Sequence, residues 1–262
     1  MGILNVTPDS FSDSGKFYEK DKAIEHGLMM AQEGADIVDV GGESTRPYSR
    51  KIPVEEELER IIPVIQALSK ELRIPISIDT YKSAVARAAL DAGASMINDT
   101  SALRADPRMP ETAAKAGVPV VLMHMKGTPS TMQDNPTYDG LIPELLNFLG
   151  EAIERAVEMG IKREMILIDP GIGFGKTFDH NLQIIKELSR FHVLDQPVVL
   201  GPSRKAFIGH ILDKPPQERE TGTLATVVAG VMNGAHVVRV HNIKETLEAV
   251  KIVDAIRRGR VR

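Results

Sequence analysis

The sequence predicts a (β/α)₈ barrel, an α/β fold of the TIM-barrel type, built from a single domain. Short runs rich in valine, isoleucine and leucine alternate eight times with longer amphipathic stretches of helical pattern. The short runs are apolar throughout, as expected of strands that are covered on both faces. Eight units in 262 residues give about 33 residues per unit, close to typical barrels. A doubly wound open sheet is the alternative, but eight evenly spaced units favour closure.

The predicted elements follow one another along the whole chain, residues 1–262, without a linker. The strands are expected at residues 2–5, 36–42, 75–80, 95–99, 119–124, 165–170, 197–201 and 237–241. The helices are expected near residues 20–34, 55–72, 81–92, 107–117, 140–160, 179–190, 203–212 with 221–233, and 243–257. Glycines that directly follow helical patterns fit C-terminal caps; they are Gly34, Gly93, Gly117, Gly160 and Gly234. Residues 213–220 are polar and read as a surface excursion in the seventh unit.

The composition excludes several classes of protein. The formal net charge is -4, whereas a dominant nucleic-acid surface usually shows as a basic excess. The absence of cysteine excludes disulfides, thiolate metal sites and cysteine nucleophiles. No apolar run approaches the roughly 18 residues of a membrane span, and nothing resembles a secretory leader. We therefore expect a cytoplasmic protein without a nucleic-acid or membrane partner. Met1 stands inside the first predicted strand, which leaves open a natural start upstream.

Polar residues stand at the carboxyl end of every predicted strand, where barrels of this kind place their active sites. In chain order they are Asn5, Asp39, Asp79, Asn98, His124, Asp169, Ser203 with Lys205, and Arg239 with His241. Any one of them would be explained as a cap or a supporting group, and His124 fits equally a supporting or a core position. All eight together indicate a shared polar ligand, because buried polar groups need partners.

The loop after the first strand is unusually polar. Residues 5–15 offer an amide, two carboxylates, several hydroxyls and the ring of Phe11, and loops of this length are usually functional or disordered. Asn5 supplies a neutral oxygen that would complete a Mg²⁺ shell together with diphosphate oxygens and waters. Asp13 would join that shell through water. The sequence therefore predicts magnesium as a cofactor.

The last two units predict an anion site. Arg239 and His241 alternate on a strand, so their side chains point the same way, and strands seven and eight form the usual phosphate corner of this fold. A guanidinium and an imidazole there fit a diphosphate; the alternative is that His241 caps the next helix. Ser203 fits the N-cap of the helix expected at 203–212. Lys205 beside that terminus favours an anion, and solvated charges are the alternative.

The sixth unit predicts a site for a flat heterocycle. Asp169 ends an apolar strand, and its carboxylate would accept two parallel N–H bonds from a guanidine-like edge. The glycines that follow allow close approach of the backbone, although a tight turn explains them equally well. Phe174 would stack on the ring, and Met123 would pack on its face, unless it is an ordinary core methionine. Asp79 and Asn98 supply further polar groups.

Two segments, residues 2–15 and 34–47, resemble signatures of dihydropteroate synthase, the sulfonamide target of folate synthesis. Ser203-Arg204-Lys205 and Arg239-Val240-His241 fit later motifs of that family, so the resemblance covers essentially the whole chain. It implies a homodimeric transferase that joins 6-hydroxymethyl-7,8-dihydropterin diphosphate to p-aminobenzoate, releasing 7,8-dihydropteroate and diphosphate.

The resemblance also implies roles for individual residues. The pterin-binding set is Asp79, Asn98, Asp169 and Lys205, lined by Met123 and Phe174. The diphosphate and magnesium set is Asn5, Arg239 and His241. Thr45 and Arg46 lie on the family's second loop. The surroundings of p-aminobenzoate are Phe11, Pro47 and Lys205, with Ser203 close by. Many relatives carry serine where this chain has Ala206, which removes one contact to the aminobenzoate carboxylate.

Two other classes of protein remain as alternatives. A pterin methyltransferase of the corrinoid type shares the fold and the pterin groups, but it would need no diphosphate site. A non-catalytic pterin-binding homologue would bind pterin diphosphate without releasing diphosphate. Dependence on Mg²⁺ and release of diphosphate distinguish these classes from the synthase.

Overall fold

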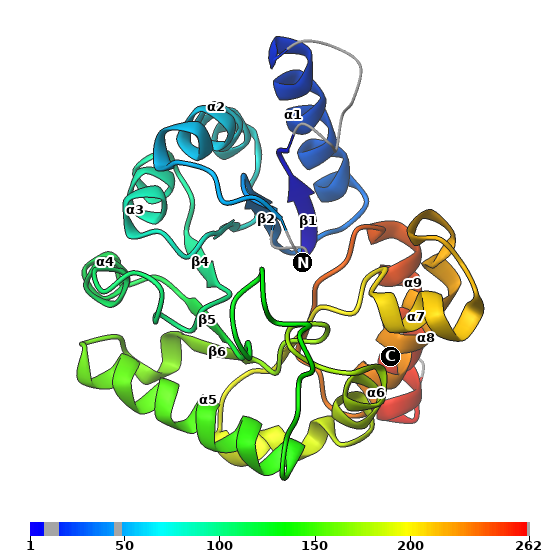
Figure 1. The fold of residues 1–262 in the computed structure, drawn as a ribbon. Coiled ribbons are helices and arrows are strands. Elements are labelled where there is room, and N and C mark those ends of the chain that lie inside the picture. Colours follow the sequence, from blue (N-terminus) through cyan, green and yellow to red (C-terminus); the bar gives the residue numbers. More distant parts are fainter. Residues whose placement is uncertain (8–15, 45–48, 261–262) are drawn as a thin grey trace.

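The computed structural model describes residues 1–7, 16–44 and 49–260, and their strands form a barrel surrounded by helices (Figure 1). Strands β1 to β6 pair in parallel in sequence order, and β7 pairs with β8. Parallel bridges from Ile168 to Val198 and from Gly2 to Val240 complete the ring. The predicted barrel is confirmed, and the open-sheet alternative is wrong because the strand order never reverses. The strands are β1 (Gly2–Asn5), β2 (Val38–Gly41), β3 (Ile76–Asp79), β4 (Met96–Asp99), β5 (Val120–Met123), β6 (Ile166–Asp169), β7 (Val199–Leu200) and β8 (Val237–Val238).

Helices connect successive strands on the outside of the barrel (Figure 1). They are α1 (Lys16–Gln32), α2 (Val54–Glu71), α3 (Ser83–Asp91), α4 (Met109–Ala116), α5 (Leu141–Glu158), α6 (Phe178–Lys186), α7 (Ala206–Leu212), α8 (Glu220–Met232) and α9 (Ile243–Arg258). Short 3₁₀ turns, which the sequence patterns did not predict, are η2 (Arg163–Met165), η3 (Leu188–Leu194) and η4 (Pro216–Glu218). The five glycines expected after helices all have positive φ. Within the described ranges, no helix combines the length and apolar character needed to cross a membrane.

Seven of the eight strands are shorter than the runs that predicted them, and β1 has the predicted bounds. The run at 237–241 contributes only the two residues of β8, but the residues that follow Val238 still bond to both neighbours. The Arg239 amide donates to the Leu200 carbonyl of β7 at 2.9 Å, and the Val240 amide donates to the Met1 carbonyl beside β1 at 3.0 Å. The end of this run therefore closes the ring, although it does not count as regular strand.

Successive residues of a strand face two different apolar cores. The residues that fill the inside of the barrel are Met1, Met96, Val121 and Val199. Val120 and Leu122, on either side of Val121, belong instead to the large cluster between strands and helices. Because both faces are buried, the strands are apolar throughout rather than alternating.

The parallel register brings the polar strand ends to one level. Asp79 pairs with Gly41 on one side and with Asn98 on the other, and Gly41 pairs with Asn5. In a barrel all carboxyl ends open on the same face. The fold therefore gathers these side chains at one mouth of the barrel.

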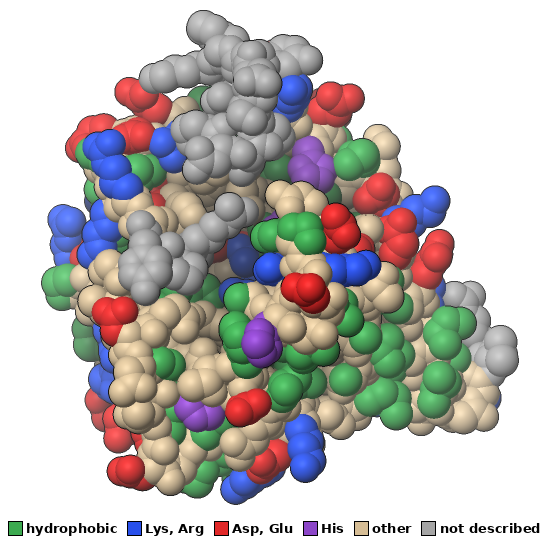
Figure 2. All heavy atoms as spheres, turned by 45° about the vertical axis from the view of Figure 1, so that its right-hand side comes forward, with side chains coloured by type: hydrophobic (Ala, Val, Ile, Leu, Met, Phe, Trp, Pro, Cys, Tyr) green, Lys and Arg blue, Asp and Glu red, His purple; other side chains and the backbone are tan. Residues whose placement is uncertain are grey.

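An outer face of the barrel carries exposed hydrophobic side chains, many of which gather on the side turned forward in Figure 2. Phe178 and Leu182 on α6, and Ile211 and Leu212 on α7, are between 40% and 57% exposed. The rings of Phe178 and His210 lie 4.6 Å apart, so the two groups adjoin. We refer to Phe178, Leu182, Ile211 and Leu212 as the α6–α7 patch; such patches often mark protein contacts.

The two-core packing predicts which isoleucines stabilise the fold. Ile97 in β4 is fully buried, whereas Ile252 on α9 is 64% exposed. We expect Ile97→Ala to lower the free energy of unfolding by about 2–5 kcal/mol, because it leaves a cavity. The matched change Ile252→Ala should cost less than about 0.5 kcal/mol. Chemical denaturation of both variants measures the difference, and equal losses would contradict this description of the core.

Candidate active site

A partly buried arginine, whose side chain is 21% exposed, joins residues of β2 and β3 to the end of β8. Arg239, directly after β8, donates from Nε to Asp39 Oδ2 at 2.6 Å and from Nη2 to Asp79 Oδ2 at 2.7 Å. Asn98 Nδ2 donates to the same Asp39 oxygen at 3.0 Å. Burial disfavours the charge on Arg239, but Asp39 and Asp79 outweigh it and raise its pKa above the ordinary value. The predicted anion-binding arginine is therefore held among carboxylates.

The two carboxylates beside this arginine differ in their surroundings. Burial raises the pKa of Asp79 to about 7, and the charge of Asp39 adds to the rise while Arg239 opposes it. Asp39 Oδ1 is buried and has no hydrogen-bond partner, which is uncommon in proteins and fits a water or ligand donor. Sequence reasoning noted Asp39 only as a strand end and gave it no role. The signal available was a carboxylate inside an otherwise apolar run, since β2 (Val38–Gly41) continues two residues beyond Asp39.

Asp169 lies in the same mouth, at the end of β6. Its Oδ1 accepts the Gly171 amide at 2.7 Å. Burial raises the pKa of Asp169, and groups close enough to oppose that rise include Lys205, Lys176 and Arg239. Gly171 has φ +73°, and a Cβ there would lie 2.0 Å from the His124 carbonyl oxygen. Only glycine fits this turn, which packs directly on the loop after β5.

Lys205 reaches over the predicted stacking residue. Its Nζ lies 4.2 Å from the centroid of the Phe174 ring, within the range of a cation–π contact. Burial, followed by the charge of Arg239, lowers the pKa of Lys205 to about 8, while Asp169 and Asp79 oppose that shift. The Phe174 ring packs against an apolar wall made of Met123, Met125 and Met132. An apolar wall, a cation and carboxylates thus face one space.

Ser203 and His241 form a pair that corrects two predictions. Ser203 Oγ lies 2.7 Å from His241 Nδ1 and also accepts the His241 amide at 3.3 Å. Ser203 is not a helix N-cap, because Arg204 adopts a left-handed φ of 56° and α7 starts only at Ala206. His241 does not cap the next helix either, since α9 has Asn242 as its N-cap without a side-chain bond. Contact of Ser203 with aminobenzoate stays a prediction.

Asn5 Oδ1 and Asp79 Oδ2 both lie close to Gly41. A Cβ on Gly41 would lie 3.9 Å from Asn5 Oδ1 and 3.7 Å from Asp79 Oδ2, so Gly41 leaves the space between them open. In the described part of the chain, no three histidines or carboxylates cluster as a metal cage. Mg²⁺ usually binds through one or two protein oxygens plus substrate phosphates and waters. The donor set fits that mode, and Asp13, the second predicted ligand, lies outside the described residues.

Of the residues predicted around aminobenzoate, Phe11 and Pro47 lie outside the described ranges, as do Thr45 and Arg46 of the second loop. The flanks of the β2–α2 connection are described, and an unpredicted lysine ties them together. Lys82 Nζ donates to Glu43 Oε2 at 2.6 Å, to Glu57 Oε2 at 2.6 Å and to the Ile52 carbonyl at 2.7 Å. Glu57 carried no sequence signal, because a glutamate in the first turn of a helix is normally solvated.

A second unpredicted lysine belongs to the β6–α6 loop, and its side chain is buried. Lys176 is only 2% exposed, and its Nζ lies 2.9 Å from His124 Nδ1. Burial lowers the pKa of Lys176 to about 7, as does Lys205, while Asp169 opposes the shift. His124 therefore supports Lys176 and is not one of the side chains that line the mouth.

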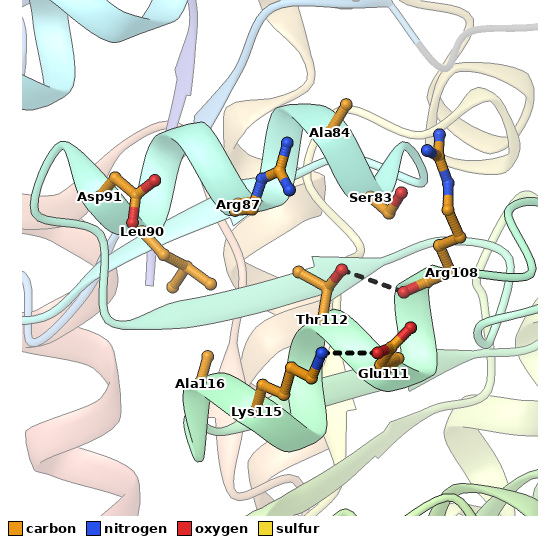
Figure 3. Close-up of a pocket in the computed structure, with 10 residues that line it drawn as sticks. All are labelled: Ser83, Ala84, Arg87, Leu90, Asp91, Arg108, Glu111, Thr112, Lys115 and Ala116. Carbon is orange, nitrogen blue, oxygen red and sulfur yellow. Dashed lines mark hydrogen bonds and ion pairs between the residues drawn. The ribbon is translucent and has the colours of Figure 1, made fainter.

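A groove of about 390 Å³ lies between α3 and α4 (Figure 3). None of its lining residues belongs to the mouth of the barrel. Its charged side chains are partly paired with one another, as in the ion pair of Lys115 with Glu111 at 2.6 Å. We therefore assign it no part in the site.

Comparison with known proteins agrees with this geometry. The model of the pterin binding enzyme family matches residues 1–241. Dihydropteroate synthase of Escherichia coli K12 is 47% identical over 97% of this chain and 90% of its own length. The structure of Yersinia pestis dihydropteroate synthase with a sulfonamide drug complex superposes with a TM-score of 0.94 at 46% identity, covering 98% of this chain and 94% of that one. The Xanthomonas albilineans enzyme in complex with 7,8-dihydropteroate gives 0.90 at 43% identity, over 98% and 92%. The chain belongs to the dihydropteroate synthase family of pterin-binding enzymes.

Proposed function

We propose that the residues gathered at the mouth carry out the family's reaction, condensing 6-hydroxymethyl-7,8-dihydropterin diphosphate with p-aminobenzoate to 7,8-dihydropteroate and diphosphate. The observation that carries the assignment of the site is the meeting of Asp79, Asp169, Lys205 and Arg239 at one barrel mouth. A bicyclic pterin with a diphosphate arm needs both carboxylates and cations within its own length. This set offers both in one space.

The pterin ring is proposed to bind between the carboxylates and the apolar wall. Asp169 would accept two N–H bonds from the aminopyrimidine edge, with Asp79 and Asn98 at the other polar atoms. Phe174 and Met123 would cover the ring faces, which is consistent with their packing in one apolar cluster. The same carboxylates favour positive charge on the ring as the C–O bond to diphosphate breaks.

His241 is proposed to hold the departing diphosphate as a hydrogen-bond donor. Ser203 Oγ already accepts the His241 amide. Its hydroxyl proton is therefore best placed to donate to His241 Nδ1, 2.7 Å away. The imidazole then carries its proton on Nε2, where it would donate to a phosphate oxygen. Lys205 and Arg239 would add positive charge beside the leaving group.

Asn5, with Asp13 through water, is proposed to hold Mg²⁺ together with the diphosphate oxygens. A bound Mg²⁺ supplies charge stabilisation to a leaving diphosphate. Aminobenzoate is proposed to contact Phe11, Pro47, Thr45 and Arg46 from the first two loops, with Lys205 and Ser203 near its amine. That amine is neutral at pH 7, so attack on the pterin methylene needs no strong base. We further propose a cytoplasmic location and a homodimer.

Release of diphosphate from the purified protein with both substrates tests the proposed function. We expect turnover that falls at least about tenfold when Mg²⁺ is removed by a chelator. Asn5→Ala should raise the Mg²⁺ concentration needed for half-maximal rate, whereas Asn147→Ala, on the exposed side of α5, should not. Diphosphate release without Mg²⁺, or an unchanged requirement in Asn5→Ala, contradicts the magnesium assignment. Binding without release would favour the non-catalytic alternative.

The lowered pKa of Lys205, about 8, predicts a pH dependence of substrate binding. Its positive charge is present below that pH and is lost above it, so the KM for pterin diphosphate should rise between about pH 7 and about pH 9. Lys205→Arg should bind more weakly, because the guanidinium has another shape. The KM of Lys205→Arg for pterin diphosphate should nevertheless rise much less between about pH 7 and about pH 9, because a guanidinium stays charged. An identical rise in both proteins would mean that another group titrates.

The homodimer proposal is tested on the α6–α7 patch. Ile211, 57% exposed, stands on this patch, whereas Met29 on α1, 44% exposed, lies elsewhere. Light scattering after size exclusion should give a dimer for the parent protein and for Met29→Glu. Ile211→Glu should dissociate, because an interface would bury the new charge. A monomeric parent protein at micromolar concentration would rule the proposal out.

A further inference from the structure

Lys176 is fully buried, yet it has no role in the reaction described above. Its Nζ lies 2.9 Å from His124 Nδ1, 2.9 Å from the Phe174 carbonyl oxygen and 3.5 Å from the His124 carbonyl oxygen. His124 follows β5, and Phe174 lies in the loop after β6. One amino group therefore joins the ends of two neighbouring strand–loop units behind the apolar wall.

The direction of these bonds follows from the charge state of His124. Burial, then the charges of Lys176 and Arg104, lower the pKa of His124 to about 2, so the ring is neutral and Nδ1 accepts. The ring itself is held edge-on against Phe148 at 4.7 Å between centroids. Lys176 is thus the donor in every contact, and its acceptors are fixed parts of the barrel.

Other side-chain hydrogen bonds hold the loop on either side of Phe174, but the Phe174 carbonyl is bonded to Lys176. Gly173 is bonded through its carbonyl to Gln133 at 2.8 Å and through its amide to Asn181 at 2.7 Å. The Gly175 carbonyl accepts from Tyr138 at 2.6 Å. Among the described contacts, the Phe174 carbonyl has only Lys176 as a side-chain donor. The Phe174 amide donates to the Gly171 carbonyl at 3.1 Å, so Lys176 completes the hydrogen bonding of the Phe174 backbone.

A lysine is an expensive choice for such a position. Removing its charge from water is costly, and only the three acceptors around Nζ offset that cost. The low pKa of Lys176, about 7, reflects its burial. A buried amino group kept at this cost holds the backbone of the residue that is predicted to stack on the ligand, which indicates a role in the site.

We propose that Lys176 is a positioning residue for pterin, which sets the Phe174 ring against the methionine wall and beneath Lys205 without touching the substrate. The inference rests on the proposed function only in that pterin binds against Phe174. Pterin affinity should then depend on Lys176, while aminobenzoate affinity should not.

Calorimetric binding of 6-hydroxymethylpterin, which needs no turnover, tests this role. Lys176→Met removes the donors but keeps the length, and we expect Kd to rise about tenfold or more, as for a misplaced contact group. The thermal unfolding midpoint is measured in the same variants, because Lys176→Met leaves buried acceptors unpaired, and the affinities are compared below the midpoint of each variant. Lys176→Gln, which keeps an N–H donor, should recover part of the affinity. Lys162→Met, the same change on an exposed lysine before η2, should leave Kd within about twofold.

A double-mutant cycle shows whether Lys176 acts through Phe174. Phe174→Ala alone should weaken pterin binding, and adding Lys176→Met should then cost little more, because the residue that it positions is gone. Additive losses, an unchanged Kd in Lys176→Met, or an affinity loss that merely follows a lowered unfolding midpoint would each overturn the inference. The KM for aminobenzoate at saturating pterin diphosphate should change less than about twofold. If the parent protein does not bind the pterin, the proposed function fails instead.

Discussion

The ion triad of Arg239 with Asp39 and Asp79 is the constraint on which the mouth of the barrel depends. It joins residues about 160 and 200 positions apart in the chain, and so ties the ends of β2 and β3 to the strand that closes the ring. Burying three charges is costly, and truncating one partner of such a group typically costs about 3–5 kcal/mol. The triad therefore enforces barrel closure and site geometry together: a mouth that opened would leave buried charges unpaired.

The same triad changes how the site handles charge. The sequence predicted Arg239 with His241 as an anion site; the guanidinium lies between Asp79, which was predicted for pterin, and Asp39, which was given no role. Asp79 already accepts from Arg239 through Oδ2, and burial raises its pKa to about 7. In the proposed complex the pterin edge would share this carboxylate with Arg239, so binding of the ring and placement of the cation would be linked.

The sequence predicted the fold and most strand-end residues because both follow from local periodicity and parallel register. Apolar runs identify strands, and register brings their last residues to one level, as with Asp79 between Gly41 and Asn98. It did not predict partners, because Asp39 meets Arg239 only through closure of the ring. Lys176 was missed because nothing in a Gly-rich turn distinguishes a buried lysine from a solvated one. Ser203 was misread as a helix cap because the left-handed Arg204 delays the helix.

The charge balance of the mouth gives an independent reason to expect a divalent cation. In the described part of the site, two cations face three carboxylates; they are Arg239 and Lys205 against Asp39, Asp79 and Asp169. Burial lowers the pKa of Lys205 to about 8 and raises the pKa of Asp79 to about 7, so both charges are costly to keep. These side chains therefore hold little net positive charge for a polyanionic diphosphate. An oxygen-coordinated metal brought in with the substrate would restore the balance, and Asn5 stands next to Asp79 with an oxygen suited to hold it.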